Sequence, residues 1–107
     1  MLTGVRFEVH VEQLISTTIE RFGRLDVAVN VAGTEGRPAP ITDVTADDYA
    51  TSFDTNVLGT PLLCIKREMR VMTSQGGGSI VNISSTMGER GAPNSALYVA
   101  SNHAVDG

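Results

Sequence analysis

Apolar residues recur at three- and four-residue intervals over residues 7–22, and this spacing predicts an amphipathic helix. The apolar stripe consists of Phe7, Val11, Leu14, Ile15, Thr18, Ile19 and Phe22. Gly23 follows the stripe, and glycine readily adopts the left-handed conformation that ends a helix. Residues 25–31 then form a short valine-rich run closed by Gly33. Such a run is typical of a strand that is buried on both faces of a parallel sheet.

A second helical pattern begins at Thr45, after a loop over residues 34–44, and continues to about residue 73. Thr45 is followed three residues later by Asp48, which resembles a capping box with Asp in place of the usual Glu. Pro61 interrupts the pattern. Because proline has no backbone N–H, we expect it to kink the helix.

The remaining chain predicts one more strand and one more helix. A flexible turn over residues 75–78 is followed by a strand over 79–84, and a last helix begins near Ser95. The order helix, strand, helix, strand, helix predicts an α/β fold in which helices connect parallel strands. No linker or internal repeat divides the chain, so we expect a single domain over residues 1–107.

Composition narrows the class of protein. The net charge is −4 and no run of Lys or Arg stands out, which argues against nucleic acid and acidic membrane surfaces as partners. The apolar runs are too short to span a bilayer, and the first residues lack a signal pattern. We interpret Cys64, the only cysteine, as a buried, reduced residue of a cytoplasmic protein. His10 and His103 have no metal-ligand spacing, so we predict no metal site.

Polar residues lie where chemistry is expected in a parallel sheet. Ligands bind beyond the carboxyl ends of the strands, here residues 30–33 and 84–86. Tyr98 and Asn102 are four residues apart and therefore share one face of the last helix. Asn56 lies in the long helix. Taken singly, each residue also has a plain structural interpretation, as a strand end, a core tyrosine or a surface asparagine.

Four motifs, in this order, closely resemble those of the short-chain dehydrogenase/reductase family. They are NVAG (30–33), NVLG (56–59), GSIVNISS (78–85) and YVASN (98–102). The usual family motifs are NNAG, N-V-x-G, a serine at the end of the fifth strand, and YxxxK. The resemblance covers nearly the whole chain. It implies that residues 1–107 are part of one Rossmann-like domain with a doubly wound parallel sheet.

The resemblance also implies a reaction, an oxidoreductase that uses NAD or NADP to interconvert small-molecule alcohols and ketones. In that reaction Tyr98 would donate or accept the proton, Ser85 would hydrogen-bond the substrate oxygen, and Asn56 would organise a water. The residues expected along the cofactor are Asn30, Ala32, Gly33, Tyr98 and Asn102. The sequence does not indicate the substrate or the choice between NAD and NADP.

Asn102 stands where the family has its lysine. Free tyrosine has a pKa of about 10, and a nearby positive charge favours its ionised form. Asparagine is neutral and cannot supply that charge. His103 does not replace the lysine, because it lies roughly 140° around the helix from Tyr98, at about 100° per residue. We therefore expect severely reduced activity.

Other family features have no counterpart here. The glycine-rich turn TGxxxGxG, which binds the cofactor pyrophosphate, and the strands after the tyrosine helix are not found. Leu2 to Val5 would be the end of the family's third strand. In a sheet of order 3-2-1-4-5-6-7, the two remaining adjacent strands expose both edges. We therefore expect a marginal monomer, an oligomer, or a chain that needs a partner. In the family, the long helix and the helix with the tyrosine commonly pack between subunits, so the resemblance implies a homo-oligomer through the helices at 45–73 and 95–107.

Three interpretations follow. The chain is a fragment carrying the catalytic half of such an enzyme, or an inactive remnant acting as an oligomerisation or protein-interaction module. The third is an unrelated small parallel α/β binding domain, which the four ordered motifs argue against.

Overall fold

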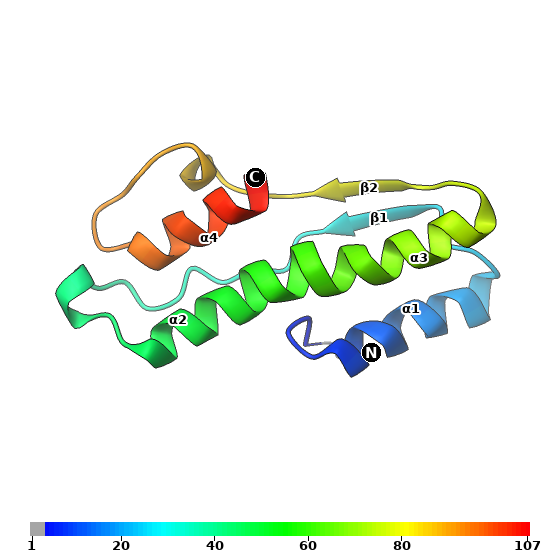
Figure 1. Cartoon of the computed structure of the whole chain (residues 1–107), viewed down its shortest axis with the longest axis horizontal. Helices are drawn as coiled ribbons and strands as arrows, with labels where there is room; N and C mark the ends of the chain where they lie inside the picture. The colour runs from blue at the N-terminus through cyan, green and yellow to red at the C-terminus, as the bar shows by residue number, and fades with distance from the viewer. Residues whose placement is uncertain (1–3) are drawn as a thin grey trace.

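The computed structural model describes residues 4–107, and its elements alternate between helix and strand as predicted (Figure 1). The elements are α1 (Glu8–Phe22), β1 (Val27–Asn30), η1 (Ile41–Asp43), α2 (Ala46–Phe53), η2 (Asp54–Cys64), α3 (Ile65–Gln75), β2 (Ser79–Asn82), η3 (Thr86–Gly88) and α4 (Ala96–Asp106). β1 and β2 pair in parallel, with Val27 opposite Ser79 and Asn30 opposite Asn82. The prediction of a parallel α/β arrangement is confirmed.

The chain enters α1 through a turn and leaves it at a glycine. The Phe7 N–H donates to the Gly4 carbonyl oxygen (3.0 Å), so residues 4 and 5 form no strand. Leu2 and Thr3, the other residues of the predicted strand end, lie outside the described residues. Gly23 ends α1 with a left-handed φ of 81°, as the sequence indicates.

α1 packs on the long helix through a small apolar core. Val11, Leu63 and Cys64 are buried there, and Val5, Ile15 and Leu58 pack around them. The predicted burial of Cys64 is confirmed, and this burial raises the pKa of the thiol to about 11.

The long helix is continuous from α2 through η2 to α3 (Figure 1). The capping box is present, because the Asp48 N–H donates to Thr45 Oγ1 (3.1 Å) and the Thr45 N–H donates to Asp48 Oδ2 (2.9 Å). Over η2 the backbone adopts a π-helix, and Pro61 lies within it. The kink expected at Pro61 stays a prediction, and the π-helix itself was not expected from the sequence. Such π segments often occur at functional sites.

Only one face of the sheet is covered. Ala28 and Asn30 are buried, whereas Val27 and Val29 are 60% and 56% exposed. The prediction that this strand is buried on both faces is therefore wrong for the described residues. The physical reason is that the face with Asn30 contacts α3 through Glu68, whereas nothing in residues 4–107 covers the valine face.

A buried polar cluster joins the covered face to α3. The Asn30 side-chain amide donates to Glu68 Oε1 (2.8 Å) and to Asn82 Oδ1 (2.9 Å). Glu68 is only 4% exposed. Burial raises the pKa of Glu68, and the hydrogen bond from Asn30 opposes part of this rise. The carboxylate form of Glu68 is therefore less favourable in the folded chain than in the unfolded chain.

We expect Glu68→Gln to stabilise the chain relative to the wild type at neutral pH. The raised pKa of Glu68 means that the folded state binds more protons, so its contribution favours folding at low pH and is lost as pH rises through the folded-state pKa. Glutamine keeps an oxygen acceptor for Asn30 and removes the charge. Thermal unfolding of both chains across the acid-to-neutral range should show a difference in Tm that grows with pH.

The matched control is Glu20→Gln, which removes an exposed carboxylate on α1. Its Tm difference from wild type should stay small. A Glu68→Gln difference that does not change with pH would contradict the assignment.

Candidate functional site

A cavity of about 300 Å³ lies at the carboxyl ends of the two strands. Both arrowheads in Figure 1 point toward the end of the molecule that holds α4. The cavity is lined by the segments after β1 and β2, by η2 and by α4; the residues are Val31, Ala32, Gly33, Thr34, Glu35, Asn56, Thr60, Ile83, Ser84, Tyr98, Asn102 and Val105. Five of the predicted site residues, Ala32, Gly33, Asn56, Tyr98 and Asn102, therefore share one cavity, as expected for an open parallel sheet.

Asn56 joins two walls of this cavity. Its side-chain Nδ2 donates to the Thr34 carbonyl oxygen (2.8 Å) and to Ser101 Oγ (3.0 Å). Its Oδ1 accepts a hydrogen bond from the Thr34 N–H (2.8 Å). Asn56 and Ser101 are 6% and 0% exposed. The amide thus fixes the loop after β1 against α4, and it has no further donor for a ligand.

Asn102 is also turned inward. Its Nδ2 donates to the Tyr98 carbonyl oxygen one turn earlier in α4 (2.9 Å), and its Oδ1 accepts from the Ser84 hydroxyl (3.3 Å). The residue is 7% exposed. A neutral amide occupied by these two contacts leaves the Tyr98 side of the cavity without a positive charge.

The two serines at the end of β2 differ in their surroundings. Ser84 lines the cavity and contacts Asn102. Ser85, the predicted substrate-binding serine, precedes η3, and its Oγ accepts from the Met87 N–H (3.2 Å). Ser85 is not among the residues that line the cavity. The sequence analysis placed both serines at the strand end and gave the substrate role to Ser85. Neighbouring residues of an extended chain point to opposite faces, so only one of the pair is expected to face the cavity.

The predicted site residues at the end of β1 and after it also differ in whether they line the cavity. Asn30, predicted beside the cofactor, directs its amide toward Glu68 and Asn82 and does not line the cavity. Ala32 and Gly33 do line it, and the Thr60 hydroxyl donates to the Ala32 carbonyl oxygen (3.2 Å). Thr60 lies one turn after Asn56 in the NVLG region, a spacing that the sequence reasoning did not use.

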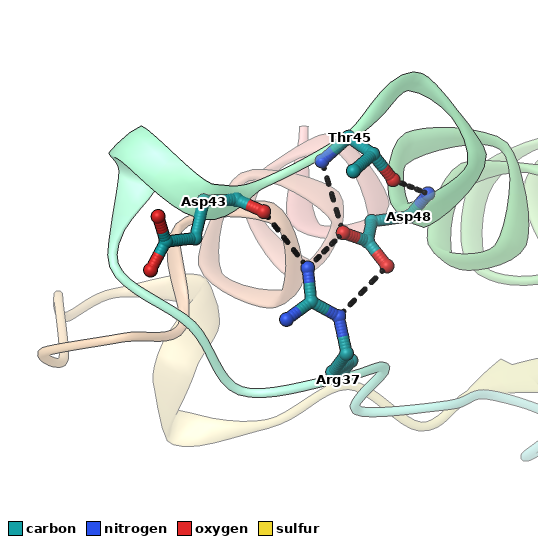
Figure 2. A network of polar contacts seen from close by, with 4 residues as sticks. All are labelled: Arg37, Asp43, Thr45 and Asp48. Atoms are coloured by element: carbon teal, nitrogen blue, oxygen red, sulfur yellow. Dashed lines mark hydrogen bonds and ion pairs between the residues drawn. The ribbon is translucent and has the colours of Figure 1, made fainter.

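The loop that continues from the cavity wall is tied to the start of α2 by Arg37 (Figure 2). The Arg37 guanidinium donates to Asp48 Oδ2 (2.6 Å) and Oδ1 (3.3 Å) and to the Asp43 carbonyl oxygen (2.9 Å). Together with the Thr45 N–H, Arg37 holds the pKa of Asp48 well below its usual range. The positive charge of Arg37 is thus engaged at the far end of the loop.

Two observations limit other kinds of site. No group of three or more His, Cys, Asp or Glu residues that could hold a metal ion occurs within residues 4–107. In the same range, no helix is both long enough and apolar enough to cross a membrane.

Parallel strands with a cavity at their carboxyl ends are the arrangement in which open α/β sheets bind their ligands. A family model described as short chain dehydrogenase matches residues 3–107. The chain belongs to the short-chain dehydrogenase family.

Individual relatives agree with this assignment. The chain is 42% identical over 97 residues to a 3beta-hydroxysteroid dehydrogenase of Mediterraneibacter gnavus, covering 91% of this chain and 34% of that protein. The NAD+-bound xylitol dehydrogenase superposes with a TM-score of 0.92 at 34% identity, covering 98% of this chain and 40% of that one. ElxO with NADP bound superposes with a TM-score of 0.86 at 39% identity, covering 94% and 40%. The chain therefore spans between 34% and 40% of the length of these relatives.

Proposed function

We propose that residues 1–107 form the proton-transfer side of an NAD(P)-dependent oxidoreductase that interconverts alcohols and ketones. The observation that supports this proposal most directly is the convergence of Tyr98, Asn102 and Gly33 on one cavity at the carboxyl ends of β1 and β2. The likeness to NAD+-bound and NADP-bound structures of the same family supports a nicotinamide cofactor.

The cavity fits one end of such a cofactor. About 300 Å³ is enough for a nicotinamide ring beside a small ligand and is too small for a whole dinucleotide. Ala32 and Gly33 present backbone and almost no side chain to it, so a flat ring can approach closely. The bound nicotinamide would supply or accept the hydride, and Tyr98 would pass the proton to or from the ligand oxygen.

Ser84 and Asn102 are polar side chains that line the same cavity as Tyr98. The Ser84 hydroxyl donates its hydrogen to Asn102 Oδ1 and lies on the cavity wall, where its oxygen can accept a hydrogen bond from a ligand hydroxyl. Ser85 keeps its hydroxyl hydrogen while accepting from the Met87 N–H, so the predicted role of Ser85, donation to the substrate oxygen, remains available to it. No ammonium or guanidinium group is among the described residues that line the cavity with Tyr98, and we propose that turnover is slow.

Cofactor binding is tested by titrating the purified chain with NADH and with NADPH. Nicotinamide fluorescence and calorimetry detect the binding. We expect saturable binding of at least one, and Tyr98→Phe should leave that binding intact because only the hydroxyl is removed. Absence of binding of both cofactors up to millimolar concentration would contradict the proposal.

We expect Asn102→Lys to raise the rate of alcohol oxidation by roughly 100-fold or more, the usual scale of a general acid–base contribution. The lysine supplies the positive charge that Asn102 lacks. Asn102→Gln is the matched control, because it lengthens the side chain without adding charge. A Lys variant that binds cofactor and gains no rate would show that this position does not limit the reaction.

A second function, as an interaction module, is supported by the uncovered sheet face. Val27, Val29, Val81 and Ile83 are 60%, 56%, 45% and 51% exposed on the described strands and the segment after β2. Exposed apolar side chains at neighbouring positions are typical of interaction surfaces. The helices at 45–73 and 95–107 remain the predicted route of homo-oligomerisation.

For the interaction module we expect self-association, seen as an average mass that rises with concentration in sedimentation equilibrium. Replacing Val29 with Thr should weaken association through the sheet face, because an exposed methyl group is replaced by a hydroxyl of similar size. A monodisperse monomer with a sharp, concentration-independent thermal transition would contradict this function.

A further inference from the structure

Glu35 is the only acidic or basic residue among those that line the cavity. The other lining residues are apolar, such as Val31, Ile83 and Val105, or carry neutral hydroxyl and amide groups. Among the described residues, the cavity lining therefore carries one formal negative charge and no positive charge. Glu35 is exposed, so its charge is in contact with solvent.

Within residues 4–107, the Glu35 carboxylate takes part in no ion pair. Arg37 is only two residues away in the same loop, but its guanidinium is bound to Asp48 and to the Asp43 carbonyl oxygen. Across the cavity, the Asn102 amide contacts Tyr98 and Ser84 and adds no charge. The net charge of the chain, −4, also repels anionic ligands.

We infer that Glu35 selects ligands by charge, so that the cavity takes neutral or cationic alcohols and carbonyl compounds and rejects those that carry a carboxylate. This inference rests on the proposed function for the alcohol or carbonyl group and adds the charge of the remainder of the ligand. The physical cause is Coulomb repulsion between two carboxylates, or attraction between Glu35 and an ammonium, at the edge of a partly desolvated cavity.

The size of the effect follows from the exposure of Glu35. Ion pairs near solvent are screened by water and salt, and their contribution corresponds to a factor of roughly two to five in a binding constant. The preference should weaken in high salt, because the screening length falls from about 10 Å at 0.1 M to about 3 Å at 1 M. Selection by shape would not change with salt.

The test compares three ligands of one shape, cyclohexanol, cyclohexylammonium and cyclohexanecarboxylate. Their affinities for the full chain are measured by NMR titration of the Gly33, Ser84 and Asn102 backbone amides at low salt, without cofactor. We expect cyclohexylammonium to bind about two- to fivefold more tightly than cyclohexanol, and cyclohexanecarboxylate to bind more weakly by a similar factor. Glu35→Gln should bring the three affinities together, and Glu35→Lys should reverse their order.

Glu20→Gln is the matched control, because it removes the same charge from α1 and Glu20 does not line the cavity. It should keep the wild-type order of affinities. The inference is overturned if Glu35→Gln keeps that order, if Glu20→Gln abolishes it, or if none of the three ligands shifts the cavity amides. Since no cofactor is present, a failure of NADH and NADPH to bind would be a separate result that refutes the proposed function and leaves the charge selection measurable.

Discussion

The hydrogen bonds of the buried Asn56 amide are the contacts on which the cavity depends. They link the backbone of Thr34, in the loop after β1, to the Ser101 hydroxyl on α4. These segments come from distant parts of the chain and make different walls. An amide can serve both because it has two donors and an acceptor in one plane. Loss of that amide would leave the partly buried N–H and carbonyl groups of Thr34 without these partners, and an unpaired group costs up to about 1–3 kcal/mol where it is cut off from water.

The position of Asn56 depends in turn on the irregular part of the long helix. Asn56 lies in η2, where the backbone follows a π-helix and Thr60 lies one turn farther on with its hydroxyl on the Ala32 carbonyl oxygen. Gly59 lies between them, and a Cβ at that position would come within 2.7 Å of Val5 Cγ2. The same short segment therefore supports the cavity wall on one side and accepts the N-terminal turn on the other. A side chain at Gly59 would clash with Val5, so either the N-terminal turn or this part of η2 would have to move.

Most of the element order could be predicted from the sequence because it depends on local patterns. Residues close together in the chain determine the apolar stripe of α1 and the left-handed glycine at its end. The same holds for the Thr45–Asp48 capping box. The bare valine face could not be predicted in this way. A run such as residues 27–30 shows that a strand suits burial, but it does not show whether the described chain contains an element to cover it.

The cavity was predictable in outline and less so in detail. Its position followed from the topology of parallel strands. The choice between Ser84 and Ser85, and the turn of Asn30 toward Glu68, depend on which face each side chain takes after the strand ends. That choice depends on tertiary contacts with α3 and η3, and the motifs alone carry no information about them. Glu35 was missed because it lies in a loop without any motif.

The pairing of β1 with β2 also has a consequence for the chain entropy of folding. The side chains of Asn30 and Asn82 form a hydrogen bond although they are 52 residues apart in sequence. Closing so long a segment costs chain entropy before the strand pairing can stabilise the chain. Contacts with large sequence separation slow folding, whereas helices form from local contacts. The long helix lies within the closed segment, so it can form first and shorten the distance that the strands must search. The cavity, which needs both strand ends and α4, can exist only after that closure.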